Sequence, residues 1–385
     1  MKQLTLGSLF DGLGGWQIAA CRAGIKPVWS SEVEKFPIAL TKFRFPYTEQ
    51  LGDVTKIKGN EIEPVDIITS GSPCQDLSVA GDRAGLSGTR SNLFFEAVRI
   101  VREMREKTNG IYPRYFVWEN VPGAFSSNKG MDFKSVLEEI TETSIPVPGH
   151  HKWAKSGMVR SRICTVVWRT LDAQYWGVPQ RRRRIFLVAD YTDGGGTEEI
   201  LFKPEVLSRD TKQGRTEREG TRPIPDGHTA KPISMCLDMS HACDVVRVNE
   251  DVCPTLQHRM GTGGNNIPLT IDKPMFCVGN GQLAQLHKQD TVGALNCMHD
   301  QQIVAICQRD GKAIAVDYRL RRLTPLECER LQGLPDNWTL IDDKTCSDSA
   351  RYKAIGNGMA QPCADFVIER IAEHDNRRVQ RHKCS

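Results

Sequence analysis

The sequence lacks long hydrophobic runs, closely spaced cysteine pairs and a large charge of either sign. No stretch approaches the roughly 18 to 20 uncharged apolar residues of a membrane-spanning helix, and Met1–Leu9 is too short and polar for a secretory signal. The 13 cysteines include no C-x-x-C pair, and their odd number in a large chain without such a signal indicates reduced thiols. These absences predict a soluble protein that stays inside the cell.

Charge and length narrow the class of protein further. The formal net charge is +4, which is too small for a histone-like or purely electrostatic nucleic-acid binder. Any surface that binds nucleic acid must therefore be local. The 385 residues, 39% of them hydrophobic, are enough for two or three domains with real cores.

The first half of the chain alternates short β-rich apolar runs with segments of helical period. Apolar residues recur at helical spacing from Leu93 to Met104 and from Phe133 to Ile140. This alternation predicts an α/β domain with a doubly wound, Rossmann-like, mostly parallel sheet. The candidate strands are Leu4–Phe10, Lys26–Ser31, Val65–Thr69, Tyr115–Glu119, Cys164–Trp168 and Arg184–Ala189.

The sequence changes in character after residue 190. Gly194-Gly195-Gly196 begins a polar stretch with scattered Pro and Gly and no sustained period. Further on, Pro325 is placed to open a helix that ends before Gly333, and a last helix is predicted over Met359–Ala372. The predicted parts are a sheet domain at 1–190, a smaller irregular domain at 191–317 and a C-terminal segment at 318–385.

A glycine-rich turn directly follows the first predicted strand. In Phe10-Asp11-Gly12-Leu13-Gly14-Gly15 the glycines let backbone N–H groups approach a ligand closely, although many α/β proteins use glycine merely to make such a turn. Glu32 ends the second strand, where its carboxylate could bind ribose hydroxyls, and Asp53 could hold an adenine amino group. Either acid alone reads equally well as a solvated loop residue. Their joint placement at strand ends favours a nucleotide-type cofactor.

A cysteine and a glutamate follow two later strands. Cys74 lies in the turn Gly71-Ser72-Pro73-Cys74-Gln75, and Glu119 ends the run Tyr115–Trp118. A lone cysteine is more often an inert core residue. Because both residues would lie at the carboxyl edge of one sheet, a thiol nucleophile beside a proton-sharing carboxyl group is predicted.

An arginine run leads into the last strand of the sheet. Gln180 is followed by Arg181, Arg182, Arg183 and Arg184, and alternation along a strand places Arg182 and Arg184 on one face. One pair is therefore available to the site, while the other faces phosphate or solvent.

Six motifs in this order resemble those of the cytosine-5 DNA methyltransferase family of bacteria and phages. The resemblance covers most of the chain outside 191–317. The matching stretches are Phe10 to Gly15, Gly71 to Gln75, Trp118-Glu119-Asn120-Val121, Gln180 to Arg184, Arg321-Arg322-Leu323-Thr324-Pro325-Leu326-Glu327 and Gly356-Asn357-Gly358.

The resemblance implies S-adenosylmethionine as the methyl donor and a set of binding residues. It also implies that 318–385 rejoins the catalytic domain. The implied cofactor-binding residues are Phe10, Gly12, Gly14, Gly15, Glu32, Val33, Asp53, Val54, Pro73, Leu93, Asn357 and Gly358. The implied substrate-binding residues are Gln75, Ser78, Arg90, Asn120, Val121 and Gln180.

The implied mechanism fits the chemistry of cytosine. Carbon 5 is a weak nucleophile, so Cys74 adds to carbon 6 and makes the ring enamine-like before methyl transfer. Glu119 holds ring nitrogen 3 and the amino group, while Arg184 and Arg182 stabilise charge on the base oxygen. These atoms are inaccessible in a stacked duplex, so the base has to be flipped out.

Residues 191–317 occupy the position of the family's target-recognition region. Basic residues and glycine-rich loops there suit readout of the major groove, although a solvated insertion has the same composition. Six cysteines between Cys236 and Cys307 are spaced too widely for common zinc patterns, so no metal is expected. Ser72, Val33 and Gly358 depart from residues frequent in the family, but none removes a chemical role.

Double-stranded DNA is the expected substrate of a monomeric enzyme in the cytoplasm of a bacterial host, with a cognate restriction endonuclease as a conceivable partner. Two alternatives stay open at this point. One is an RNA cytosine methyltransferase of similar fold. The other is an inactive scaffold that binds DNA, although Cys74, Glu119 and Arg184 together argue against it.

Overall fold

The structure is a computed structural model that describes most of the chain. The long described ranges are 3–72, 93–192, 195–202 and 321–384, and the short ones are 235–238, 247–250, 252–258, 260, 267–271, 276–277, 303–307 and 313–319. The chain forms two compact units. The first comprises Met1–Tyr175, Arg183–Gly220 and Cys363–Ser385, and the second Trp176–Arg182 and Thr221–Pro362.

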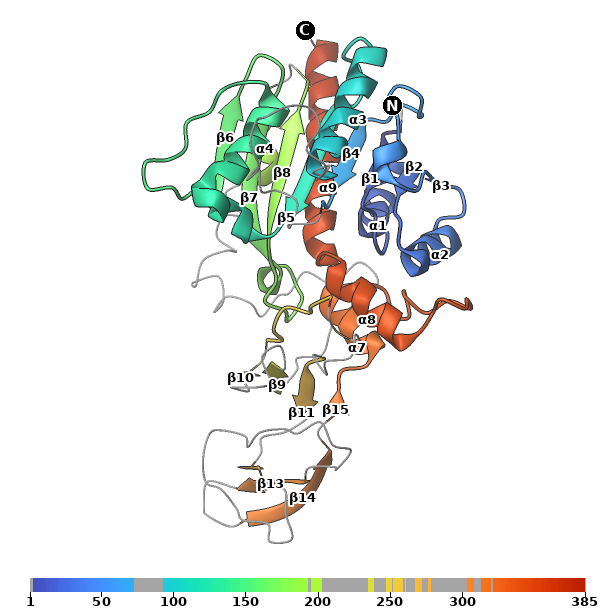
Figure 1. Cartoon of the computed structure of the whole chain (residues 1–385), viewed down its shortest axis with the longest axis vertical. Helices are drawn as coiled ribbons and strands as arrows, with labels where there is room; N and C mark the ends of the chain where they lie inside the picture. The colour runs from blue at the N-terminus through green and yellow to red at the C-terminus, as the bar shows by residue number, and fades with distance from the viewer. Residues whose placement is uncertain are drawn as a thin grey trace. The chain divides into compact units, whose positions relative to one another are not determined.

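An eight-stranded sheet forms the centre of the first unit (Figure 1). The spatial order of the strands is β3-β2-β1-β4-β5-β8-β7-β6. The first five strands in this order are parallel, and β8, β7 and β6 are each antiparallel to the strand before them. The bounds are β1 Thr5–Leu9, β2 Lys26–Ser31, β3 Glu49–Gln50, β4 Ile67–Ser70, β5 Tyr115–Asn120, β6 Ser156–Arg160, β7 Thr165–Asp172 and β8 Arg183–Asp190. The predicted doubly wound, mostly parallel α/β fold is confirmed.

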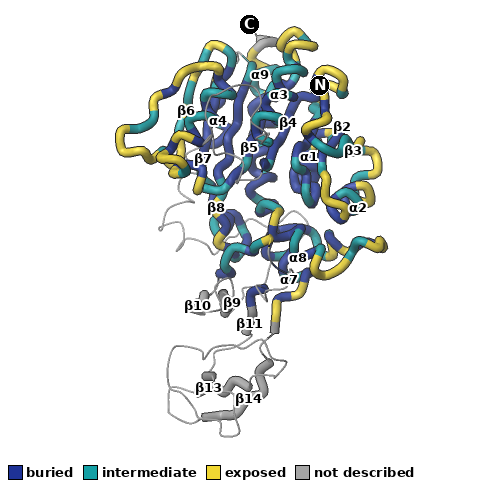
Figure 2. Tube along the Cα trace, in the orientation of Figure 1, coloured by how far each residue is buried: buried dark blue, intermediate teal, exposed yellow. Residues whose placement is uncertain are grey.

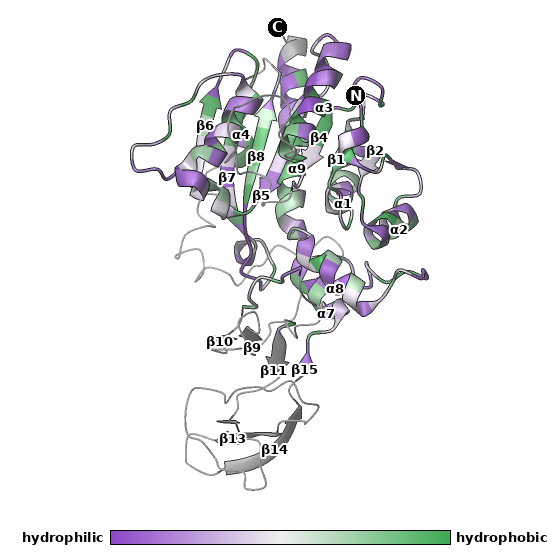
Figure 3. Cartoon of the chain, in the orientation of Figure 1, coloured by the Kyte–Doolittle hydropathy of each residue, from purple (hydrophilic) through white to green (hydrophobic). Residues whose placement is uncertain are grey.

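Helices cover both faces of this sheet because each carries an apolar stripe. Those of the first unit are α1 Gly15–Arg22, α2 Lys35–Arg44, η1 Val54–Lys56, α3 Leu93–Lys107, η3 Pro122–Phe125, η4 Ser127–Gly130, α4 Met131–Thr141, η5 Ala173–Tyr175 and α5 Glu198–Leu201. Helices α3 and α4 pack on a core that includes Trp118, Phe133 and Trp168. On the other face, Trp16 of α1 packs edge-on against Phe186 of β8. Figure 2 shows the central strands of this sheet buried, and Figure 3 shows apolar residues concentrated along them.

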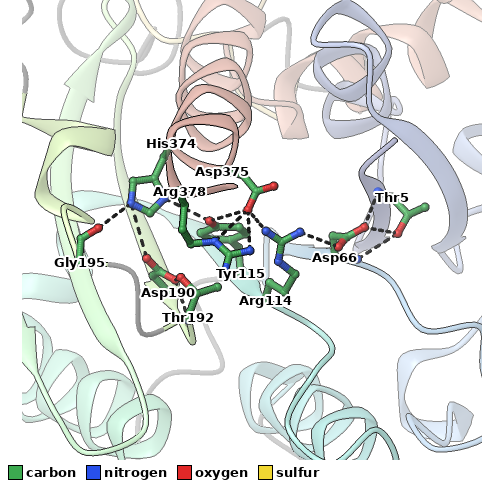
Figure 4. A network of polar contacts seen from close by, with 10 residues as sticks. All are labelled: Thr5, Asp66, Arg114, Tyr115, Asp190, Thr192, Gly195, His374, Asp375 and Arg378. Atoms are coloured by element: carbon green, nitrogen blue, oxygen red, sulfur yellow. Dashed lines mark hydrogen bonds and ion pairs between the residues drawn. The ribbon is translucent and has the colours of Figure 1, made fainter. Parts of the chain in front are cut away.

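The C-terminal part of α9 (Gln361–Cys384) returns to the sheet of the first unit. The Tyr115 hydroxyl lies 3.1 Å from Nδ1 of His374, and Arg114 pairs with both Asp66 and Asp375 (Figure 4). These contacts lie where the parallel strands begin. The helix is longer than the predicted Met359–Ala372 because the polar residues after 372 are held by this network.

The second unit contains helices and short strands. Helix α7 (Pro325–Gln332) starts with a capping box of Thr324 and Glu327 and ends at Gly333, as predicted, and α8 spans Asp348–Asn357. Two small sheets are β10-β9-β11-β15 and β12-β13-β14. Their strands are β9 Met235–Asp238, β10 Arg247–Glu250, β11 Leu269–Ile271, β12 Phe276–Cys277, β13 Ile303–Cys307, β14 Ala313–Arg319 and β15 Arg321–Arg322. The predicted domain limits, 1–190, 191–317 and 318–385, remain a prediction. The two compact units divide the chain differently, since 363–385 belong to the first unit and 221–362 to the second.

Candidate active site

The turn after β1 has a backbone that few residue types adopt. Phe10, Gly12 and Gly14 have φ of 56°, 54° and 77°, all in the left-handed region. A Cβ on Gly14 would also lie 2.8 Å from the Phe45 ring, so only glycine suits this position. Helix α1 begins at the next residue, Gly15, which directs its first N–H groups towards the carboxyl edge of the sheet.

Glu32 is fixed beside this turn by three backbone N–H groups. Its Oε2 accepts from Gly12 at 2.8 Å, and its Oε1 accepts from Val33 at 2.7 Å and Glu34 at 3.0 Å. The carboxylate therefore has one defined orientation at the end of β2. Val33, next to it, is an apolar side chain left 64% exposed.

Asp53 caps the short helix η1 at the same edge. Its Oδ1 accepts from the backbone N–H of Thr55 at 3.0 Å and from the Thr55 hydroxyl at 2.8 Å, and the backbone bond is the main reason why the pKa of Asp53 is lowered. Val54 behind it is buried, and Leu93 at the start of α3 is half-buried. Asp53 is thus held ionised as a hydrogen-bond acceptor.

A further acid in the turn was not singled out from the sequence. Asp11 is buried, and burial raises its pKa to about 7, with a smaller raising effect from the charge of Glu32. Gln17 donates from Nε2 to Asp11 Oδ2, which lowers the pKa in part. The signal was available in the sequence, since Gln17 is the one polar residue between Trp16 and Ala20 on a helix that packs on the sheet.

Glu119 and Arg184 meet at the carboxyl end of β5. Arg184 Nε lies 3.0 Å from Glu119 Oε1, and the side chains are 17% and 13% exposed. Antiparallel pairing of β5 with β8 brings them together, because Glu119 lies opposite Phe186 and Arg184 is two residues earlier on β8. The site therefore has a carboxylate with an adjoining cation in a largely dry setting.

The segment that carries Cys74 starts from an anchored residue. Ser72 Oγ accepts from Trp118 Nε1, and Ser72 O accepts from Asn120 Nδ2, both at 3.1 Å. A Cβ on the preceding Gly71 would lie 3.7 Å from Glu119 Oε2. Three residues before Cys74, the chain is therefore beside Glu119. Pro73, Cys74, Gln75, Ser78 and Arg90 lie outside the described residues.

A known protein family matches nearly the whole chain. The model of the C-5 cytosine-specific DNA methylase family matches residues 4–373. The chain belongs to this family. Its members use S-adenosylmethionine as methyl donor, and this chain has the corresponding DNA (cytosine-5) methyltransferase fold and motifs.

Individual relatives are similar over nearly the whole chain. A protein of Escherichia phage P1 named DNA N-6-adenine-methyltransferase is 28% identical over 97% of this chain, which spans 62% of that relative. The orphan methyltransferase M.SPRI of Bacillus phage SPR is 30% identical over 96% of this chain and 98% of its own length. Several others are named type II methyltransferases. The structure of S. pombe Dnmt2 is similar in fold, with a TM-score of 0.58 at 16% identity over 97% of this chain and all of that one.

The cofactor residues of the methylase family fit S-adenosylmethionine here. Nothing lies within 4 Å of an ideal Cβ on Gly12 or on Gly52, so there is open space beside both Glu32 and Asp53. Two carboxylates fixed at the ends of neighbouring strands suit ribose hydroxyls and an adenine amino group, and Val33 is an exposed apolar side chain next to Glu32.

Three residues of the predicted arginine motif, Gln180, Arg181 and Arg182, belong to the second unit. Arg182 is 1% exposed and donates to the carbonyls of Leu256, Gly356 and Gly358. Gln180 is buried and pairs with Cys253 in an isolated β-bridge. Its side-chain amide has no hydrogen-bond partner among the described residues. In the structure Arg182 therefore braces main-chain segments, whereas Arg184 contacts Glu119.

The predicted cofactor residues near the C-terminus also lie in the second unit. Asn357 is exposed at the end of α8, and Gly358 is half-buried. The preceding Gly356 has no room for a side chain, since its Cβ would lie 2.2 Å from Gln257 O. This close approach explains a glycine at 356.

Asn120 and Val121 are placed by each other and by Ser72. Asn120 is buried, and its Oδ1 accepts from Val121 N at 2.8 Å. Asn120 therefore orients the backbone beside Glu119.

Within the described ranges, no group of three His, Cys, Asp or Glu side chains could hold a metal ion, and no helix is long and apolar enough to span a membrane.

Proposed function

We propose that this chain is a sequence-specific DNA methyltransferase that modifies carbon 5 of a cytosine flipped out of duplex DNA, through a transient covalent bond to Cys74. The observation that carries the proposal is the Glu119–Arg184 pair, 3.0 Å apart, beside the anchored start of the Cys74 segment. A nucleophile, an acid and a cation at one sheet edge are what the chemistry of cytosine requires.

The residues would act in turn on the base. Cys74 thiolate forms a bond to carbon 6, and the ring electrons move towards carbon 5. Glu119, protonated for this step, donates its O–H to nitrogen 3 and accepts a hydrogen bond from the amino group. S-adenosylmethionine, when bound, supplies the methyl group to carbon 5. Removal of the proton from carbon 5 then returns an electron pair to the ring and expels the Cys74 thiolate.

Arg184 has two tasks in this scheme. Its Nε holds the Glu119 carboxylate, and its Nη1 donates to Arg183 O, which fixes the guanidinium plane. The remaining N–H groups are available to the base oxygen, where negative charge grows during addition of the thiolate. A lysine has no comparable planar fork and would not serve both tasks.

Several finer features belong to the same proposal. We infer that the enzyme acts as a monomer on DNA in the cytoplasm of a bacterial host. Pairing with a restriction endonuclease stays a prediction, because the relatives include both type II methyltransferases and an orphan methyltransferase.

A trapping experiment tests the covalent step. Fluorine at carbon 5 cannot leave as a proton does, so DNA amplified with 5-fluorodeoxycytidine triphosphate should hold the enzyme as a denaturation-resistant adduct when S-adenosylmethionine is present. We expect the adduct with the natural chain and with Cys21→Ser, which removes an exposed thiol on α1. Cys74→Ser should give none. An adduct that persists in Cys74→Ser would overturn the proposal, as would its absence from a folded natural chain that binds S-adenosylmethionine.

A further inference from the structure

A basic surface lies at the carboxyl edge of the sheet, away from the cofactor turn. Between Glu142 and Asp172 the chain has no acidic residue, and the loop before β6 carries His150, His151 and Lys152, with Lys155 next to the strand. All four are exposed. Figure 2 shows this loop as exposed and Figure 3 as hydrophilic.

A second segment adds a charge to this surface. Lys129, in η4, is exposed, and a Cβ on the next residue, Gly130, would lie 3.1 Å from His151 O. Trp153 Nε1 donates to Gly130 O at 2.8 Å, which ties the loop to η4. We call Lys129, His150, His151, Lys152 and Lys155 the lysine surface. No carboxylate pairs with its three ammonium groups among the described residues.

The lysine surface is held rigidly. The Trp153 ring packs edge-on against Phe133 and Trp168, with centroids 5.3 and 6.2 Å apart. Lys129 and His151 have φ of 53° and 54°, left-handed values that cost about 1 kcal/mol or more each for residues other than glycine. Positive charges are thus kept close together by a fixed backbone, against their mutual repulsion.

The lysine surface is within reach of a substrate at Glu119. Asn120 pairs with Ile185, Ile185 pairs with Thr170, and Thr170 N donates to Lys155 O at 2.8 Å. These residues form one row across the sheet. Three steps of one strand spacing place Lys155 about 14 Å from Asn120. Lys129 is ten residues after Glu119 on the same edge.

Resting on the function proposed above, we propose that the lysine surface binds the phosphate backbone of duplex DNA that flanks the methylated cytosine. Duplex DNA presents a negative charge about every 1.7 Å along its axis, so a helix held at Glu119 brings several phosphates past Lys155, whose backbone lies about 14 Å from that of Asn120, and past the neighbouring lysines. The contact carries no sequence information and serves affinity and orientation. Lysines on or beside an edge strand also prevent that strand from pairing with a strand of another molecule. This role does not explain Lys129 and Lys152, because both lie outside the edge strand β6.

The test compares two pairs of lysines that carry equal charge. In the surface variant, Lys152→Gln is combined with Lys155→Gln. In the control, Lys26→Gln is combined with Lys107→Gln, which are exposed at the start of β2 and the end of α3, at the opposite edge of the sheet. All proteins carry Cys74→Ser, so binding is measured without the covalent step and its outcome is separate from that of the trapping experiment.

The measurement is the affinity for a fluorescent, mixed-sequence DNA duplex at a series of salt concentrations. The surface variant should lower the slope of log Kd against log salt by about 2, one for each lysine, and the control should leave it unchanged. Equal slopes in both variants would overturn the proposal, since any weakening of DNA binding would then reflect the change in net charge alone. It would also be overturned if the surface variant weakened binding of mixed-sequence RNA and left the DNA slope unchanged.

Discussion

The charge of Asp11 depends strongly on its place in the fold. It lies in the glycine turn beside Glu32, buried and hydrogen-bonded to Gln17, with its pKa raised to about 7. A pKa raised above that of the unfolded chain means that the folded state holds the proton more tightly. Its favourable contribution is therefore complete below about pH 4 and is lost as the pH rises towards 7.

The Asp11→Asn variant should remove this dependence. Asparagine resembles the protonated acid, so the variant should gain stability relative to the natural chain between pH 5 and 8, on the order of 2 kcal/mol. Urea unfolding at both pH values measures the difference, in which all other titrating groups cancel. Parallel stability curves for the two proteins across this range would show that Asp11 does not titrate there.

Much of the candidate site was accessible from residue patterns. Glu32, Asp53 and Glu119 follow strands whose ends meet at one edge, and a sheet fixes that geometry once the strands are recognised. The hydrogen bonds of the Ser72 and Arg182 side chains could not be predicted from the sequence. Their partners lie 46 positions from Ser72 and 74 or more positions from Arg182 along the chain. The alternation that paired Arg182 with Arg184 assumes one continuous strand, whereas β8 begins at Arg183.

Among the elements, α9 shows how a distant segment completes the sheet unit. Its polar residues meet the beginnings of β1, β4 and β5 through Asp66, Arg114 and Tyr115 (Figure 4). Arg114 neutralises two buried carboxylates, Asp66 and Asp375. The spacing of apolar residues alone could not predict this docking, because the C-terminal part of α9 is held by polar side chains and ion pairs.

Replacing Arg114 by glutamine should loosen this helix. Asp66 would lose its paired cation and Asp375 would keep only Arg378, so the free energy of unfolding should fall by about 3 kcal/mol. Arg99→Gln is the control, because Arg99 pairs with Glu96 and Glu103 on the exposed side of α3 and should cost about 0.5 kcal/mol. Urea unfolding gives both values. The account of α9 is wrong if the two substitutions cost the same.

For the whole molecule, the parallel half of the sheet was predictable, whereas in the second unit only helix α7 was. Buried strands of four to six residues separated by amphipathic helices leave a clear pattern. The short strands between Met235 and Arg322 span two to seven residues and show no period.

Sequencing of DNA for its modified bases tests the central claim most directly. A bacterium free of DNA methylation would express the natural chain or Cys74→Ala, and nanopore sequencing would report both 5-methylcytosine and N6-methyladenine. We predict 5-methylcytosine at one recurring short sequence with the natural chain and none with the variant. Methylated adenine in its place, or cytosine methylation that survives the loss of Cys74, would contradict the account.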